Sequence, residues 1–219
     1  MVSPKARAAP RSDIARRRME RREAGRRRSD ERWSEIIAGA AQVFRRLGYA
    51  QATLEDVAQE VGINRATLYY YVGTKEELLV SMLDRPIEQL RTRLEEIAEG
   101  AEPPSQQLAR ALREYTTGLA EEPELTVFVA ENVHRAMKGP EADRIRDNAD
   151  RYGRVLAGII AKGARTGEFR SDIEPSVAVL GILGMFNWMH RWFDPSGPRS
   201  LTEIGEDFVA LALGGLQPS

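Results

Sequence analysis

Residues 53–75, TLEDVAQEVGINRATLYYYVGTK, constrain the fold of this chain more than any other stretch. Thr53 and Asp56 have the spacing of a capping box, and apolar residues then recur at helical intervals as far as Gly62. Glycine at this position can adopt the left-handed backbone conformation that a tight turn requires. A second short helix is expected over about residues 65–72. The stretch therefore predicts a helix-turn-helix arrangement.

The second helix carries three consecutive tyrosines, Tyr69, Tyr70 and Tyr71. Successive helical residues lie about 100° apart around the axis, so the three rings cannot all point into a core beside Leu68. At least one ring must lie at the surface. One interpretation is that these are core and rim residues of an amphipathic helix. The other is a recognition helix, in which Arg65 reads guanine and tyrosine hydroxyls bind phosphates.

The run INRATLYYYVGTKEELL resembles the helix-turn-helix signature of the tetracycline-repressor (TetR) family of bacterial regulators. The resemblance is close from Trp33 to about Leu79, and elsewhere it extends only to the helical layout. It implies that one set of residues binds DNA phosphates: Thr53, Tyr71 and Lys75. It implies that a second set faces the bases: Arg65, Ala66, Thr67, Tyr69 and Tyr70.

The charge of the chain is distributed unevenly, although its net value is only −1. Residues 1–32 hold 12 of the 32 Lys and Arg residues but only 5 of the 33 Asp and Glu residues. Residues 1–28 have almost no large apolar side chains, so we predict a disordered basic N-terminal arm. Such an arm could equally follow the DNA backbone or enter the minor groove. A membrane-surface segment is a weaker alternative, because no apolar stripe accompanies the arginines.

The remaining apolar pattern predicts an all-α fold with two parts. Residues 29–74 are expected to form a three-helix helix-turn-helix head, and residues 75–219 a larger helical body for ligand binding and dimerisation. We expect Pro86 to kink or break the first body helix. The helices expected in the body span about 75–99, 105–120, 123–137, 141–166, a stretch that begins at Pro175, and 201–216.

The helix that begins at Pro175 is apolar on nearly all sides, as its segment VAVLGILGMFNWMHRWF indicates. A soluble protein must bury such a helix on more than one side, so we expect it to pack on its own core and on a second chain. The predicted homodimer interface includes Leu183, Phe186, Phe208 and Leu211. Two heads on one dimer would read a palindromic operator in double-stranded DNA.

The TetR resemblance also implies a small-molecule pocket in the body. Surplus aromatic and methionine residues could line it, although each of them taken singly is more often core filler. The segment NWMHRWFDPSGPRSLTEIGEDFVALALGGL is similar to TetR regulators of fatty-acid and steroid breakdown, which commonly respond to acyl-CoA thioesters. We therefore expect a hydrophobic ligand such as an acyl-CoA. The candidate pocket residues are Phe128, Tyr152, Met185, Trp188, Met189 and Trp192.

These patterns favour a ligand-responsive transcriptional repressor that a hydrophobic ligand releases from its operator. The alternatives are a DNA-binding dimer without a small-molecule switch and an adaptor for a protein partner. An enzyme is not expected, because the chain has no cysteine, no Gly-rich phosphate loop and no GxSxG motif. We also expect no cofactor and no metal site. No apolar run is long enough for a membrane span or a signal peptide, so the expected location is cytoplasmic.

Overall fold

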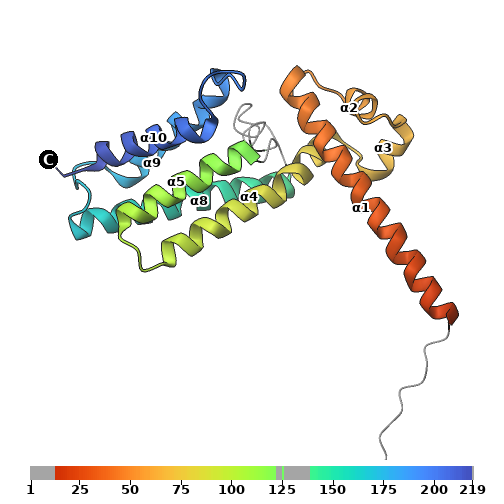
Figure 1. The fold of residues 1–219 in the computed structure, drawn as a ribbon, viewed down its shortest axis with the longest axis horizontal. Coiled ribbons are helices and arrows are strands. Elements are labelled where there is room, and N and C mark those ends of the chain that lie inside the picture. The colour runs from red at the N-terminus through yellow and green to blue at the C-terminus, as the bar shows by residue number, and fades with distance from the viewer. Residues whose placement is uncertain (1–12, 122–124, 126–138, 219) are drawn as a thin grey trace, which may run out of the picture.

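The computed structural model describes residues 13–121, 125 and 139–218, in which all regular secondary structure is helical (Figure 1). This confirms the all-α prediction. The head and the body lie side by side, and the first turn of one long helix joins them. The head contains α1 (Asp13–Leu47), α2 (Leu54–Val61) and α3 (Arg65–Tyr71). The body contains α4 (Lys75–Glu99), α5 (Pro104–Glu121), α8 (Pro140–Thr166), α9 (Pro175–Trp188), the 3₁₀ turn η1 (Met189–Arg191) and α10 (Leu201–Leu216). The expected helix at 123–137 lies outside the described residues apart from residue 125.

The head core forms where the buried stripe of α1 meets α2 and α3. Ile36, Ala40 and Phe44 lie on this stripe and are 0–1% exposed. Gly39 lies between them, and a Cβ atom added there would meet Val61 Cγ2 at 2.4 Å. A larger residue at position 39 would therefore push α2 away from α1.

Helix α1 begins at Asp13, well before residue 29, where the predicted head begins (Figure 1). The prediction of a disordered arm is therefore wrong for residues 13–28. Arginine, glutamate, alanine and methionine dominate this segment, and all four have high helix propensity. The spacing of Asp13 with Arg17, and of Glu23 with Arg27, also supports a helix through i, i+4 charge pairs. Residues 1–12 lie outside the described residues.

Helix α4 is 25 residues long and continues through Pro86, so the helix does not break there, which was one of the two expected effects of this proline. Proline removes one backbone hydrogen bond, but the neighbouring Leu83 and Ile87 are buried in the body and hold the helix in place. The far end of α4 is capped by the buried Gln107 of α5. Its amide nitrogen donates to the carbonyls of Ile97, Ala98 and Gly100, at 3.0, 3.2 and 2.8 Å.

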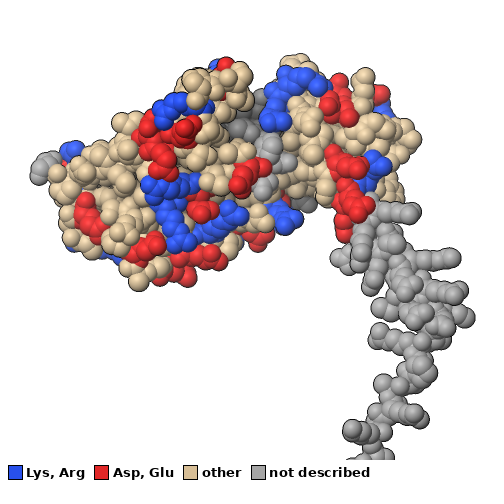
Figure 2. Space-filling view, in the orientation of Figure 1, with Lys and Arg blue, Asp and Glu red and all other residues tan. Residues whose placement is uncertain are grey.

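Ion pairs connect α4 to its neighbours along the body. Asp84 pairs with Arg144 of α8 at 2.8 Å, and Arg93 pairs with Glu114 of α5 at 3.3 Å. On the face shown in Figure 2, basic and acidic side chains are interspersed over the body. No broad surface of one charge sign is visible there that would draw DNA to the body.

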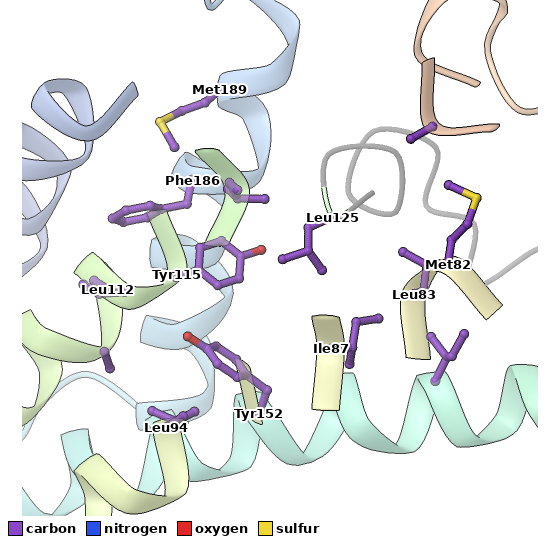
Figure 3. Close-up of a cluster of buried hydrophobic side chains, with 14 of the residues drawn as sticks. Met82, Leu83, Ile87, Leu94, Leu112, Tyr115, Leu125, Tyr152, Phe186 and Met189 are labelled. Carbon is purple, nitrogen blue, oxygen red and sulfur yellow. The ribbon is translucent and has the colours of Figure 1, made fainter. Parts of the chain in front are cut away.

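The body core is built mainly from α4, α5, α8 and α9 around a group of aromatic rings (Figure 3). The Tyr115 ring lies 5.7 Å from that of Tyr152 and 6.1 Å, edge to face, from that of Phe186. Helix α10 packs very closely on α5, because a Cβ atom added to Gly205 would lie 2.5 Å from Thr116 Cγ2. These contacts fix the positions of α9 and α10 on the body.

Candidate nucleic-acid interface

The start of α2 is stabilised by a complete capping box. The Thr53 backbone N–H donates to Asp56 Oδ2 at 2.8 Å, and the Asp56 N–H donates to Thr53 Oγ1 at 3.2 Å. Hydrogen bonds from Thr53 lower the pKa of Asp56, so this carboxylate stays ionised at neutral pH. The turn that follows α2 contains Gly62 with φ 70°, as the sequence predicts. Thr53 is exposed at the N-terminus of α2, where anions bind favourably.

Helix α3 is anchored by one buried leucine and presents the opposite face to solvent. Leu68 is fully buried, whereas Tyr69 is 42% exposed and Tyr70 is 83% exposed. Arg65 and Ala66 are exposed on the same outward side. Four of the five predicted base-facing residues therefore share one accessible surface of a short helix.

Thr67 takes part in the N-terminal cap of α3 and is half-buried. Its backbone N–H donates to Asn64 Oδ1 at 2.8 Å, and its hydroxyl donates to the same oxygen at 2.9 Å. The Thr67 side chain therefore helps to start the helix, which the pattern of base-facing residues alone did not indicate.

Arg65 is oriented by its neighbours on both short helices. Its guanidinium donates to the Tyr69 hydroxyl at 3.2 Å and lies 5.2 Å from the centre of that ring. It also pairs with Glu55 of α2 at 3.4 Å, and both side chains are more than 60% exposed. Exposed ion pairs contribute little free energy, so Arg65 can exchange Glu55 for another acceptor at small cost.

Tyr71 is half-buried and joins α3 to α1. Its ring stacks on Trp33 with centroids 6.2 Å apart and meets Tyr70 edge to face at 5.3 Å. The predicted phosphate contact is therefore combined with a packing role that supports the exposed Tyr70 ring. The sequence pattern gave no sign of the stack between Tyr71 and Trp33.

The position of the Lys75 side chain differs from the one that its predicted phosphate-binding role requires. Its ammonium donates to the carbonyls of Tyr49, Ala50 and Ala52, at 2.7, 3.3 and 2.8 Å. An ammonium group has three N–H donors, so this arrangement leaves none for a phosphate. The sequence could not indicate these contacts, because the backbone carbonyls between α1 and α2 come near Lys75 only in the folded chain.

The predicted pocket residues differ in how deeply they are buried. Tyr152 and Met189 are buried, and Met185 is half-buried. Trp188 and Trp192 are instead 60% and 50% exposed, because α9 gives way to η1 near the body surface. Phe128 lies outside the described residues.

Tyr152 nevertheless has one feature of a ligand-binding residue. Burial raises the pKa of its hydroxyl, and no hydrogen-bond partner for that hydroxyl is found among the described residues. The neighbouring Tyr115 hydroxyl, by contrast, donates to Asn187 Oδ1. Figure 3 shows both tyrosines within the same buried cluster.

The predicted dimer residues divide between the surface and the interior. Leu211 is 61% exposed, and Leu183 and Phe208 are half-buried. Phe186 is fully buried in its own chain, where its ring meets Phe208 edge to face at 5.4 Å. The assignment of Phe186 to the dimer interface is therefore wrong, because its side chain is buried in the core of its own protomer and presents no surface to a partner.

An exposed apolar stripe on α9 was not singled out in the sequence. Val177, Leu180 and Trp188 are 59%, 73% and 60% exposed and recur at helical spacing on one side of α9. A helix that is apolar on all sides gives no sequence signal of which side faces inward, so these residues could not be distinguished from core residues.

The described ranges contain neither a metal-binding cluster nor a membrane-spanning helix. No three His, Asp or Glu side chains there come together in a way that could hold a metal ion. Within the same ranges, no helix is both long and apolar enough to cross a membrane.

Comparison with known proteins gives matches over both parts of the chain. The family described as "Bacterial regulatory proteins, tetR family" matches residues 36–82, and the family described as "Tetracyclin repressor-like, C-terminal domain" matches residues 101–216. The repressor KstR2 of Mycolicibacterium smegmatis is 24% identical over 86% of this chain and 92% of its own length. The fatty acid metabolism regulator protein of Bacillus subtilis is 25% identical over 84% of this chain and 95% of its own length.

A solved structure of AibR in complex with isovaleryl coenzyme A and operator DNA has the same fold. Its TM-score is 0.72 at 21% identity, covering 82% of this chain and 97% of that one. The expected similarity to fatty-acid and steroid regulators is confirmed, because the Bacillus subtilis relative is named a fatty acid metabolism regulator and the solved structure of KstR2 from Mycobacterium tuberculosis is described as a ketosteroid transcriptional regulator. The two family matches cover the helix-turn-helix and most of the body, and the chain belongs to the TetR family of bacterial regulators.

Proposed function

We propose that this chain is a transcriptional regulator that places the outward face of α3 in the major groove of duplex DNA. The observation that carries the proposal is the shared exposure of Arg65, Ala66, Tyr69 and Tyr70 on the second helix of a helix-turn-helix. Arginine can donate two hydrogen bonds to guanine, and tyrosine hydroxyls can bind bases or phosphates. The exposed N-terminus of α2 at Thr53 adds a phosphate-binding position beside this face.

The regulator acts as a homodimer on a palindromic operator. The α9 stripe of Val177, Leu180 and Trp188, together with Leu211 of α10, supports this, since isolated subunits rarely expose so many large apolar residues together. The two helices from each subunit would form a four-helix bundle. The paired α3 helices would then meet half-sites about 34–36 Å apart or at a multiple of that distance.

The basic N-terminal part of α1 adds affinity that does not depend on the DNA sequence. Residues 13–28 contain eight arginines and three acidic residues, and they extend the helix that carries the head. Arginines near the phosphate backbone release counterions, so this segment should make binding strongly dependent on salt.

The regulator is a repressor, and its effector is a hydrophobic molecule of the acyl-CoA class. KstR2 is named as a repressor, and AibR was solved with an acyl-CoA thioester. The Tyr152 hydroxyl has no hydrogen-bond partner among the described residues, and this supports a ligand in the body. A buried hydroxyl without a partner costs about 1–3 kcal/mol, which a polar ligand atom would recover. Movement of α4 would carry the signal to the head and release the operator. A dimer that binds DNA without such a switch is the second candidate.

The proposal is tested by selecting duplexes from genomic fragments and measuring their affinity for variants. Arg65→Ala and Tyr70→Ala should each weaken binding by about 1–3 kcal/mol, the usual contribution of one good base contact. Arg93→Ala on the body is the matched control and should bind like the wild type. Variants at Arg65 and Tyr70 that bind as tightly as the control would contradict the proposed face.

The ligand is tested separately by heating curves with acyl-CoA thioesters of different chain lengths. A ligand present at 100 times its Kd should stabilise the folded protein by about 2.7 kcal/mol. A thioester that stabilises the protein and lowers its operator affinity supports the switch. Unchanged unfolding with all chain lengths favours the dimer without a small-molecule switch.

A further inference from the structure

Lys75 occupies a position where a free cation would be unfavourable. It is the first residue of α4, and the positive end of the helix macrodipole lies there. Its three short contacts with carbonyl oxygens compensate for this, because they bring negative partial charge to the ammonium. The ammonium also lies 4.6 Å from the centre of the Tyr49 ring.

These contacts all fall on the connection between α1 and α2. Ala52, one of the three acceptors, is buried and directly precedes the capping residue Thr53. The Ala52 N–H also donates to the carbonyl of Gly48 at the end of α1. Lys75 therefore holds the segment whose position decides where α2 begins.

Glu76, the second residue of α4, also interacts with the connection between α1 and α2. Burial, and then the nearby Glu76 carboxylate, raise the pKa of the Tyr49 hydroxyl. The Tyr49 ring in turn meets Phe44 of α1 edge to face at 5.3 Å. The first turn of α4 thus touches the end of α1 and the start of α2 together.

We propose that Lys75 is a positioning residue, which fixes the phosphate-facing start of α2 to the first turn of α4 and does not itself bind DNA. Any tilt of α4 would then move the α1–α2 connection with it. The effect on DNA binding rests on the proposed function, whereas the effect on the free protein does not.

The test uses two variants of the full chain. Lys75→Met removes all three donors and the charge. Lys75→Arg keeps the charge and a good phosphate-binding group, but its planar fork cannot direct three donors from one point at three carbonyls. Should Lys75→Met not fold, as judged by circular dichroism, Lys75→Arg carries the same test alone.

The first measurement is amide hydrogen exchange of the free protein. We expect residues 52–57 to exchange about tenfold faster or more in both variants, because local opening becomes easier there. Amides of α5, far from the junction, serve as the internal control and should be unchanged. Unaltered exchange at residues 52–57 would overturn the proposal.

The second measurement is the salt dependence of operator affinity. We expect the Kd to rise about tenfold in both variants, while the slope of log K against log salt stays at the wild-type value. A lost phosphate contact would instead reduce the slope by about 0.9 per protomer, and Lys75→Arg would bind like the wild type. Either of those results would overturn the proposal. A wild-type protein that binds no duplex would refute the proposed function, and the exchange measurement would still decide the role of Lys75.

Discussion

Gly205→Ala should destabilise the body, because the methyl group it adds has no room. The new Cβ atom would lie 2.5 Å from Thr116 Cγ2, 2.7 Å from Thr116 Oγ1 and 3.0 Å from Thr116 Cβ. The last of these atoms is attached directly to the backbone of α5, so a side-chain rotation cannot remove the contact. Either α10 must move away from α5 or the two helices must be strained.

The size of the effect follows from two opposing contributions. Overpacking a close contact costs about 1–3 kcal/mol, whereas replacing glycine by alanine inside a helix gains about 1 kcal/mol. We therefore expect a net loss of up to about 2 kcal/mol in the free energy of unfolding. Urea unfolding at one fixed protomer concentration measures it, since dimer stability depends on concentration.

Gly158→Ala in α8 is the matched control. Apart from its chain neighbours and the nearby backbone of α8, no atom of the described residues lies within 4 Å of the Cβ that it would add, and the residue is exposed. This variant should be more stable than the wild type by up to about 1 kcal/mol. Adding Thr116→Ala to Gly205→Ala removes the two nearest atoms and should recover part of the loss. Equal stability of the Gly205 and Gly158 variants would refute the packing argument.

Two further predictions concern the capping box and the body core. Thr53→Ala should cost about 1 kcal/mol at pH 7 through the loss of the cap. Because Thr53 lowers the pKa of Asp56, its stabilisation is present above the unfolded pKa of aspartate and is lost as pH falls through the lower folded value. Urea unfolding should therefore show a smaller difference from the wild type at pH 3 than at pH 7, and an equal difference would count against the coupling. Tyr152→Phe should leave the free protein as stable or more stable, because it removes a buried hydroxyl that has no partner in the part of the chain that the structure describes. Calorimetry should also show weaker effector binding. A clear loss of stability without effector would indicate that the hydroxyl is already paired.

The head could be predicted closely because its signals are local. Thr53, Gly62 and the three adjacent tyrosines each restrict the backbone or the surface within a few residues, so their structural consequences can be read in order along the chain. The outward position of Tyr70 follows from helical geometry alone.

Other features depend on distances that the sequence does not contain. The Lys75 ammonium could have faced solvent, a phosphate or carbonyl groups, and only the folded connection at residues 49–52 decides between them. In α9, uniform hydrophobicity does not indicate which side is buried, so Phe186 was predicted to lie in the dimer interface although it belongs to the core of its own chain. For residues 13–28, high charge indicated disorder while helix propensity indicated a helix, and the structure follows the propensity.

The central claim is that the exposed face of α3 lies against DNA. The chain contains no cysteine, so one introduced thiol can report on one position. Ala66→Cys places it on the exposed face of α3, and Thr92→Cys places a control thiol at an exposed position on α4. The measurement is the rate of thiol alkylation with and without a selected duplex. We predict that saturating duplex strongly slows alkylation at position 66 and leaves position 92 unchanged, whereas equal rates at position 66 with and without bound duplex would contradict the account.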